Sequence, residues 1–255
     1  MPRLIFYRGW NSQPLPKPRG GRGRGRRTGW LAVALVIGIA ALGIVSVYLF
    51  LGVGRQETSA VQQKPIILYV NQGNGIVNGS GFGRMLEYAS SNGFNTVFFQ
   101  VYREGHLLFS PATLQSFVNQ THRAGLKMFF ALYITDASQA LPVSVFGLRE
   151  DGVSLDMSTV SLGAQQSFLG ALKSDFKGQT AVTTIDMFSP LKPDLLVLET
   201  YGKGNQQYIR AGIVASVGVF ATSDMADYQS QFEYALQNSD GVMVFDYYGL
   251  QKAGY

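Results

Sequence analysis

The sequence predicts an α/β fold, a small or degenerate (β/α)8-type (TIM) barrel preceded by a single transmembrane helix. From residue 65 onwards, strand-like and helix-like patterns alternate, which is typical of a parallel sheet because parallel neighbours need crossover connections. Polar residues recur at the C-terminal ends of the strand-like runs, where the mouth of a barrel tolerates them and a doubly covered open sheet does not. The stretch 31–53 carries no charged side chain.

The first 29 residues predict a disordered basic tail. They hold eight Lys and Arg residues and no acid, and their prolines and the run GGRGRGRR cannot bury enough apolar surface to fold. An RGG-like nucleic-acid segment or a twin-arginine export signal at Arg26-Arg27 is the alternative. Because the run ends just before the apolar stretch, we favour a topogenic charge cluster that meets anionic lipid headgroups.

Residues 30–54 predict a transmembrane signal-anchor helix in contact with membrane lipid. The 23 uncharged residues LAVALVIGIAALGIVSVYLFLGV cover the roughly 30 Å of a bilayer's hydrocarbon as a helix. The basic flank precedes the stretch and only Arg55 follows it closely, which predicts a cytoplasmic N-terminus and an extracellular C-terminal domain in the cell membrane. The stretch exceeds a signal h-region and no clear A-x-A site follows, so we expect the anchor to be retained. Residues 55–64 form a polar linker to the barrel domain, 65–255.

Seven short apolar runs are typical of strands, and NTVFFQVY is the clearest of them. The stretch 134–157 is harder to assign: it predicts a long loop with a short strand at 153–155, which would supply an eighth strand. The seven expected strands are 66–70, 95–102, 127–133, 181–186, 195–199, 212–220 and 241–246.

Helical spacing fills most of the gaps between these strands. Ser110 and Pro111 supply an N-cap and a first-turn proline for a helix that Gly125 stops. No helix is expected after the last strand. The other expected helices end at Gly93, run from about 161 to 176, and run from a cap near 222 or 223 past Leu236.

Carboxylates at the C-terminal rim are the candidate catalytic groups. Active sites of (β/α)8 enzymes form at this rim, and here the strands end on Glu199, Asp246 and Asp186. Paired carboxylates suit glycoside cleavage, in which one protonates the leaving oxygen and the other attacks or activates water. A carboxylate at a strand end is also a common loop cap or ion-pair partner.

Aromatic and polar side chains expected at the same level would bind the substrate. Simple alternation along 95–102 places Gln100 and Tyr102 on the face that looks into the barrel. Tyrosines there would stack on sugar rings, while amides and an arginine would donate hydrogen bonds. The candidate substrate-binding residues are Asn71, Gln100, Tyr102, Arg103, Tyr133, Tyr201 and Tyr247.

Composition argues against other chemistries. The two histidines, His106 and His122, lack metal-ligand spacing and the chain has no cysteine, so we expect no metal and no cofactor. The glycines between 73 and 83 complete no phosphate-binding motif and predict a loop over the barrel mouth. Residues 30–255 carry thirteen bases and sixteen acids, which disfavours nucleic acid as a partner.

Four segments resemble uncharacterised glycosyl-hydrolase-like TIM-barrel proteins. They are GFNTVFFQVYREGHLLFS, AGLKMFFALY, PDLLVLETYG and DGVMVFDYYG. The resemblance implies a sugar-polymer substrate and a catalytic role for Glu199, with Asp246 or Asp186 as its partner. The chain departs from that pattern in its small size and in lacking an evident eighth strand unless 153–155 supplies it.

The sequence therefore predicts a membrane-anchored, extracytoplasmic glycoside-hydrolase-like protein that cleaves a polysaccharide. Glu199 would be the general acid, and Asp246 the nucleophile or base. The alternative is a non-catalytic barrel domain that binds surface glycans or cell-envelope proteins.

Overall fold

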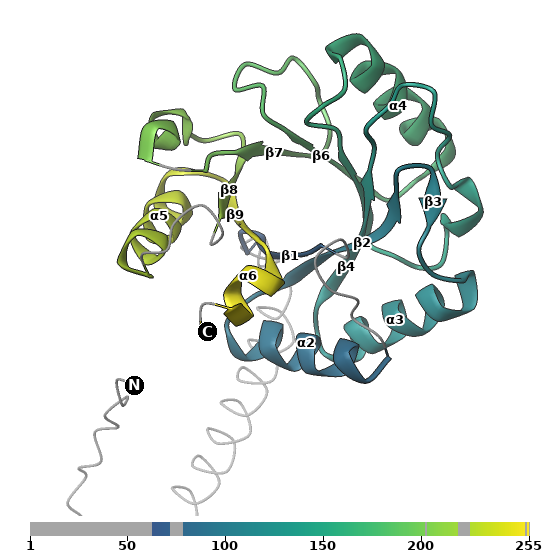
Figure 1. Ribbon diagram of the computed structural model, residues 1–255, viewed down its shortest axis with the longest axis horizontal. Helices are drawn as coiled ribbons and strands as arrows, with labels where there is room; N and C mark the ends of the chain where they lie inside the picture. Colours follow the sequence, from purple (N-terminus) through teal and green to yellow (C-terminus); the bar gives the residue numbers. More distant parts are fainter. Residues whose placement is uncertain (1–62, 72–78, 202, 219–224, 253, 255) are drawn as a thin grey trace, which may run out of the picture. The chain divides into compact units, whose positions relative to one another are not determined.

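Eight parallel strands close into a barrel in the part of the chain that the computed structural model describes, residues 63–71, 79–201, 203–218, 225–252 and 254. The ring closes because β1 pairs in parallel with β2 on one side and with β9 on the other (Figure 1). The strands of the ring are β1 (Ile66–Val70), β2 (Thr96–Arg103), β4 (Lys127–Tyr133), β5 (Gly152–Asp156), β6 (Gln179–Thr184), β7 (Leu195–Glu199), β8 (Val214–Gly218) and β9 (Gly241–Phe245).

The predicted parallel barrel is confirmed, and β5 supplies its eighth strand from the stretch that was hardest to assign. A further short strand, β3 (His106–Leu107), was not predicted. It pairs antiparallel with the end of β2 and forms a hairpin at the C-terminal rim of the barrel. Glu104 and Gly105 turn that hairpin with φ of 50° and 90°.

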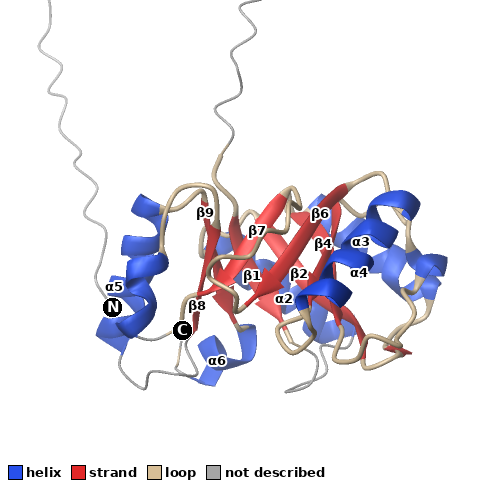
Figure 2. Ribbon diagram, turned by 90° about the horizontal axis from the view of Figure 1, so that it is seen from above, coloured by secondary structure: helices blue, strands red, loops and turns tan. Residues whose placement is uncertain are grey.

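Helices flank the strands on the outside of the barrel (Figure 2), but they do not follow every strand. The connections from β4 to β5, from β6 to β7 and from β7 to β8 hold no α-helix among the described residues. The helices are α2 (Gly79–Ser91), α3 (Pro111–Arg123), α4 (Leu162–Asp175), α5 (Met225–Asn238) and α6 (Tyr247–Lys252), with 3-10 turns η1 (Val143–Val145) and η2 (Lys203–Tyr208).

Two local expectations about the helices were wrong. The chain forms α6 directly after the last strand, where no helix was expected. Gly79, Gly81 and Gly83 lie in α2 and not in a loop over the mouth. The predicted start of α3 is confirmed, since the Ser110 hydroxyl oxygen accepts a hydrogen bond of 3.2 Å from the Thr113 backbone N–H.

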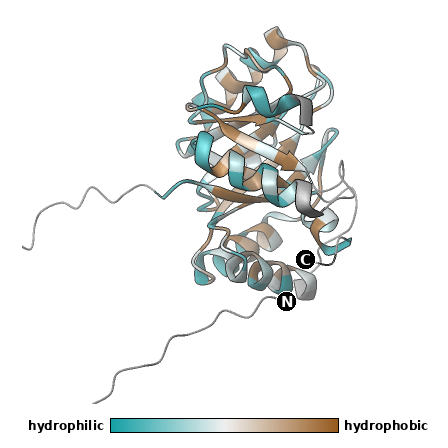
Figure 3. Cartoon of the chain, turned by 90° about the vertical axis from the view of Figure 1, so that its left-hand side faces the viewer, coloured by the Kyte–Doolittle hydropathy of each residue, from teal (hydrophilic) through white to brown (hydrophobic). Residues whose placement is uncertain are grey.

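Two apolar cores hold the barrel together. The larger one lies between the strands and the surrounding helices, and Figure 3 shows hydrophobic residues along the strands and hydrophilic residues on the outer helices. The smaller one fills the barrel interior, where the Phe98 and Phe129 rings stack with centroids 4.8 Å apart. The inner core comprises Ile67, Tyr69, Phe98, Phe129, Ala131, Ala181, Val197, Val214 and Met243.

The predicted basic tail (1–29) and membrane helix (30–54), with most of the linker (55–64), lie outside the described residues. Within the described residues, no helix has the length and apolarity needed to cross a bilayer. Lys64, the last residue of the predicted linker, donates hydrogen bonds from Nζ to the carbonyl oxygens of Leu236 (3.0 Å) and Ser239 (2.8 Å). These two hydrogen bonds join the Lys64 side chain to the C-terminal end of α5.

We expect Gly152→Ala to destabilise the barrel by about 1–3 kcal/mol, the usual range for overpacking a core. Gly152 is buried in β5, and a Cβ there would overlap the ring of Phe129. Urea denaturation measures the free energy of unfolding. The matched control is Gly170→Ala on the exposed side of α4, where a Cβ meets nothing and alanine should stabilise the helix by roughly 0.5–1 kcal/mol. Equal stability of the two variants would contradict this packing of Phe129.

Candidate active site

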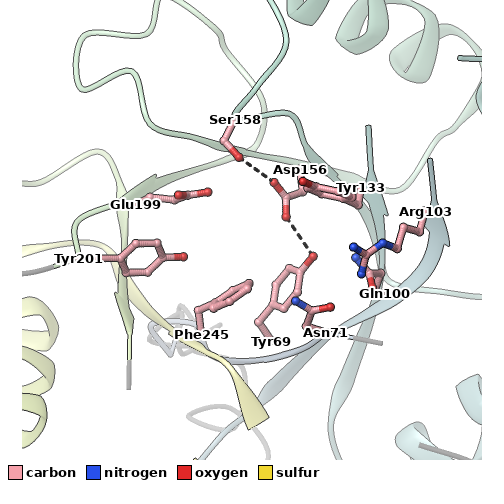
Figure 4. Close-up of a pocket in the computed structure, with 10 residues that line it drawn as sticks. All are labelled: Tyr69, Asn71, Gln100, Arg103, Tyr133, Asp156, Ser158, Glu199, Tyr201 and Phe245. Atoms are coloured by element: carbon pink, nitrogen blue, oxygen red, sulfur yellow. Dashed lines mark hydrogen bonds between the residues drawn. The ribbon is translucent and has the colours of Figure 1, made fainter. Parts of the chain in front are cut away.

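A polar pocket of about 240 Å³ opens at the C-terminal mouth of the barrel (Figure 4). Its walls come from six of the eight strands of the ring or from the residues that follow them, since parallel strands place their C-terminal ends at one rim. The pocket is lined by Tyr69, Asn71, Gln100, Arg103, Tyr133, Asp156, Ser158, Glu199, Tyr201 and Phe245.

Two carboxyl groups face this pocket from alternate strands. Asp156 is the last residue of β5, in register with Tyr133 of β4 and Thr183 of β6. Glu199 is the last residue of β7, in register with Ser216 of β8. Because β6 separates the two strands, their backbones lie roughly 10 Å apart at a strand spacing of about 4.8 Å. Both side chains line the same pocket (Figure 4).

The Asp156 carboxyl is held by two hydroxyl groups. The Tyr69 hydroxyl donates to Oδ2 at 3.1 Å and the Ser158 hydroxyl donates to Oδ1 at 3.4 Å. The residue is only 6% exposed. Burial disfavours the charged form and raises the pKa of Asp156 to about 6, while the two hydrogen bonds act in the opposite direction. The carboxyl is thus oriented but incompletely stabilised as an anion.

Glu199 has the higher pKa of the two carboxyls. Burial raises it most, and the negative charge of Asp156 raises it further, to about 7, against a hydrogen bond with Ser158 that lowers it. When both groups face one pocket, the protonation of one favours ionisation of the other. Near neutral pH the pocket therefore offers a carboxylic acid beside a carboxylate.

Three aromatic side chains form one wall of the pocket. Phe245 lies between Tyr69 and Tyr201, with ring centroids 4.9 Å and 6.0 Å away. The Ser216 hydroxyl donates to the Tyr201 hydroxyl oxygen at 3.3 Å. Burial raises the pKa of Tyr69 and Tyr201 well above the usual value for a phenol, so both hydroxyls remain protonated at neutral pH.

A β-bulge corrects the expected direction of two side chains at the end of β2. The pairing with β4 is in step up to Gln100 and shifts between Gln100 and Tyr102. Tyr102 consequently turns outward into the core beneath the helices, and its hydroxyl donates to the Ala140 carbonyl oxygen at 2.7 Å. Arg103 pairs with Tyr133 and lines the pocket in its place.

Asp186, Asp246 and Tyr247 are not among the residues that line the pocket. The Asp186 carboxylate accepts a hydrogen bond of 3.0 Å from the Phe188 backbone N–H and so caps the turn after β6. The Asp246 carboxylate accepts one of 2.9 Å from the Gly249 backbone N–H at the start of α6.

Tyr247 begins α6 and packs on Tyr88 of α2 with ring centroids 5.4 Å apart. Its hydroxyl oxygen accepts a hydrogen bond of 2.7 Å from Gln251. The predicted residues that do meet in the pocket are Glu199, Asn71, Gln100, Arg103, Tyr133 and Tyr201.

Sequence reasoning missed Asp156 and Ser158 as residues of the pocket. The available signal was the short strand at 153–155, since an aspartate directly after a barrel strand lies at the mouth.

Among the described residues, no group of three or more His, Cys, Asp and Glu side chains is placed to hold a metal ion.

Comparison with known proteins finds structural likeness without sequence likeness. No protein-family model matches the chain, and no curated protein matches it by sequence. CpGH84B is similar over 71% of this chain and 44% of its own, with 8% identity and a TM-score of 0.48, so this chain spans less than half of its length. The xylanase and α-amylase inhibitor protein XAIP-II from Scadoxus multiflorus is similar over 74% and 95%, with 8% identity and a TM-score of 0.47.

A third structure, the noncanonic maltogenic α-amylase AmyB from Thermotoga neapolitana, is similar over 75% of this chain and 69% of its own, with 13% identity and a TM-score of 0.46. At these levels the likenesses carry no argument about substrate or activity.

We expect Asp156→Asn to remove a loss of stability that the wild type shows as pH rises through about 4 to 6. The folded-state pKa of about 6 lies above the ordinary aspartate pKa of 3.8, so wild-type stability falls as pH rises through that window. The difference in unfolding free energy between variant and wild type should therefore grow by about 3 kcal/mol from pH 3 to pH 8. Urea denaturation at several pH values measures it, and a difference that does not change with pH would contradict the burial of this carboxyl.

Proposed function

We propose that the barrel is a glycoside-hydrolase-like domain that cleaves a polysaccharide by acid/base chemistry, with Glu199 and Asp156 as the paired carboxyl groups. The observation that supports this most is that both carboxyls line one pocket at the barrel mouth and both have raised pKa values. This proposal replaces the predicted partners Asp246 and Asp186, whose carboxylates cap backbone N–H groups.

The higher pKa of Glu199 makes it the general acid in this proposal. Its proton passes to the glycosidic oxygen as the bond from that oxygen to the anomeric carbon breaks. Asp156, with the lower pKa, then acts as the anion. It either attacks the anomeric carbon, in a retaining reaction, or takes a proton from an attacking water, in an inverting one. The first route needs carboxyl groups about 5–5.5 Å apart and the second about 6.5–9.5 Å.

The remaining lining residues suit a sugar ring. Tyr133 and Tyr201 supply aromatic surface, and Asn71 and Gln100 supply amides, all within the same pocket. Aromatic faces pack against the apolar faces of sugars, while amides bond the hydroxyls at the edge of the ring. Tyr102 and Tyr247 are engaged outside the pocket and have no substrate contact in this proposal.

The proposed location is the outer face of the cell membrane. It rests on the sequence alone: an uncharged stretch within 30–54 that would contact membrane lipid, preceded by a tail with eight basic residues and no acid. An extracytoplasmic barrel would meet polysaccharide in the envelope or the surroundings.

We expect Glu199→Gln and Asp156→Asn each to lower polysaccharide cleavage by about 10²–10⁴-fold, because each removes one partner of the acid/base pair. Release of reducing sugar from a panel of polysaccharides measures this. The matched control is Glu233→Gln, the same chemical change at an exposed position on α5, which should leave the rate unchanged. Glycan binding by the wild type without any turnover would favour the non-catalytic alternative.

We also expect a bell-shaped dependence of kcat/KM on pH. Activity should rise through about pH 6 as Asp156 ionises and fall through about pH 7 as Glu199 loses its proton. Tyr69→Phe removes a hydrogen bond that lowers the pKa of Asp156, so the acidic limb should move to higher pH. Tyr234→Phe, an exposed tyrosine on α5, serves as the control. An acidic limb that stays in place in Tyr69→Phe would argue against Asp156 as the anion.

A further inference from the structure

Arg103 is the single cationic side chain among the residues that line the pocket. The β-bulge at the end of β2 turns it toward the mouth, and the β2–β3 hairpin directly follows it. Bulges are common next to active sites, where they change the direction of a side chain. The local backbone therefore places a positive charge in a pocket that otherwise contains two acids.

The contacts of Arg103 leave one end of its guanidinium available. Nε donates to Glu104 Oε1 at 3.2 Å, and the guanidinium carbon lies 5.4 Å from the centroid of the Tyr133 ring. Within the described part of the chain, Nη1 and Nη2 donate no hydrogen bond to protein. The side chain is 37% exposed, and Figure 4 shows its guanidinium directed into the pocket.

Arg103 does not serve as a counter-ion for the two acids. The Asp156 carboxyl is bonded by Tyr69 and Ser158, and no ion pair joins Arg103 to Asp156 or to Glu199 among the described residues. The pKa of both carboxyls is raised, with no lowering by the charge of Arg103. Arg103 is ion-paired through Nε with Glu104, which is not among the residues that line the pocket. Its terminal N–H groups, which have no acceptor among the described residues, remain for a ligand.

We propose that Arg103 binds the carboxylate of a hexuronic acid unit, so that the substrate of the barrel is an acidic polysaccharide. This inference rests on the proposed function and names the class of its substrate. The planar guanidinium matches a carboxylate, with two parallel N–H···O bonds, and the Tyr133 ring beneath it holds it in place. One positive charge beside two acids suits a singly charged group and not a dianionic phosphate.

The order of the strands around the mouth fits a sugar ring in this orientation. Going round the ring, Arg103 on β2 is separated from Asp156 on β5 by β4 alone, and Asp156 is separated from Glu199 on β7 by β6 alone. Asp156 therefore lies between the other two. A hexuronic acid over Asp156 would direct its carboxylate toward Arg103 and its glycosidic oxygen toward Glu199.

Binding of matched sugar pairs tests the inference without requiring turnover. Titrations of the full chain with D-glucuronate against D-glucose, and D-galacturonate against D-galactose, give dissociation constants by calorimetry. We expect the wild type to bind each uronate roughly tenfold more tightly than the neutral sugar, because a charge-assisted bidentate pair adds that much. In Arg103→Gln the preference should vanish, and Arg123→Gln, an exposed arginine on α3, should retain it.

Two further readouts separate a binding defect from misfolding and from failure of the proposed function. Urea denaturation of Arg103→Gln should match wild type, because the side chain is partly exposed and its replacement creates no cavity. Equal binding of the members of each pair, no binding of any sugar, or tighter binding of glucose 6-sulfate than of glucuronate would each overturn the inference. Uronate binding through Arg103 with no polysaccharide cleaved would support it while refuting the enzymatic proposal. Cleavage of neutral polysaccharide at an unchanged rate in Arg103→Gln would support the enzymatic proposal and overturn the inference about Arg103.

Discussion

The pairing of β1 with both β2 and β9 is the constraint on which the site depends. It closes the sheet, so the inward-facing side chains of all eight strands share one interior. The stacked Phe98 and Phe129 rings fill part of that interior, and the residues that line the pocket lie at the C-terminal ends of the strands. In an open sheet of the same strands, helices would cover both faces and Asp156 and Glu199 would lie beneath them. Strands covered on both faces are almost uniformly apolar, so carboxyl groups are rare there.

Closure also accounts for the electrostatics of the pocket. Asp156 and Glu199 lose water because they face a narrow space walled by Tyr69, Tyr201 and Phe245. The hydroxyls of Tyr69 and Ser158 compensate Asp156 only in part, so its pKa still lies above the ordinary value. Burial of such carboxyl groups lowers the free energy of unfolding at neutral pH. Groups with pKa values shifted in this way are concentrated at functional sites. Among the described residues, Arg103 is the one cationic residue that lines the pocket beside these two acids.

Most of the fold could be predicted from local patterns, because the apolar runs of the strands and the N-cap of α3 are properties of short segments. The strand that carries Asp156 was predicted only as a short segment, 153–155, within a long loop. Its sequence, GVSLD, has a glycine and a serine where an apolar run is expected. The structure explains the glycine, since the Phe129 ring from the neighbouring strand occupies the space that a Cβ would need. Because this reason lies in a neighbouring strand, it could not be inferred from the sequence of the segment itself.

The direction of side chains at the pocket was predicted where simple alternation holds and was wrong where a bulge interrupts it. Gln100 lies on the expected face, but the bulge that follows it exchanges Tyr102 for Arg103 at the mouth, and a bulge is defined by the register with β4. Asp246 and Asp186 stand at strand ends as expected. Their carboxylates bond backbone N–H groups two or three residues onward, a local capping role in which aspartate competes well. The rim position was predictable, and the group that each oxygen contacts was not.

The central claim is that Asp156 and Glu199 share one desolvated pocket, and a carbon-13 NMR titration of the side-chain carboxyl groups tests it most directly. With the two signals assigned through Asp156→Asn and Glu199→Gln, this account predicts midpoints at about 6 and about 7, with the Glu199 midpoint falling when Asp156 is replaced. Midpoints near 4 for both groups, unchanged by replacement of the other, would show two separate, solvated carboxylates and would contradict it.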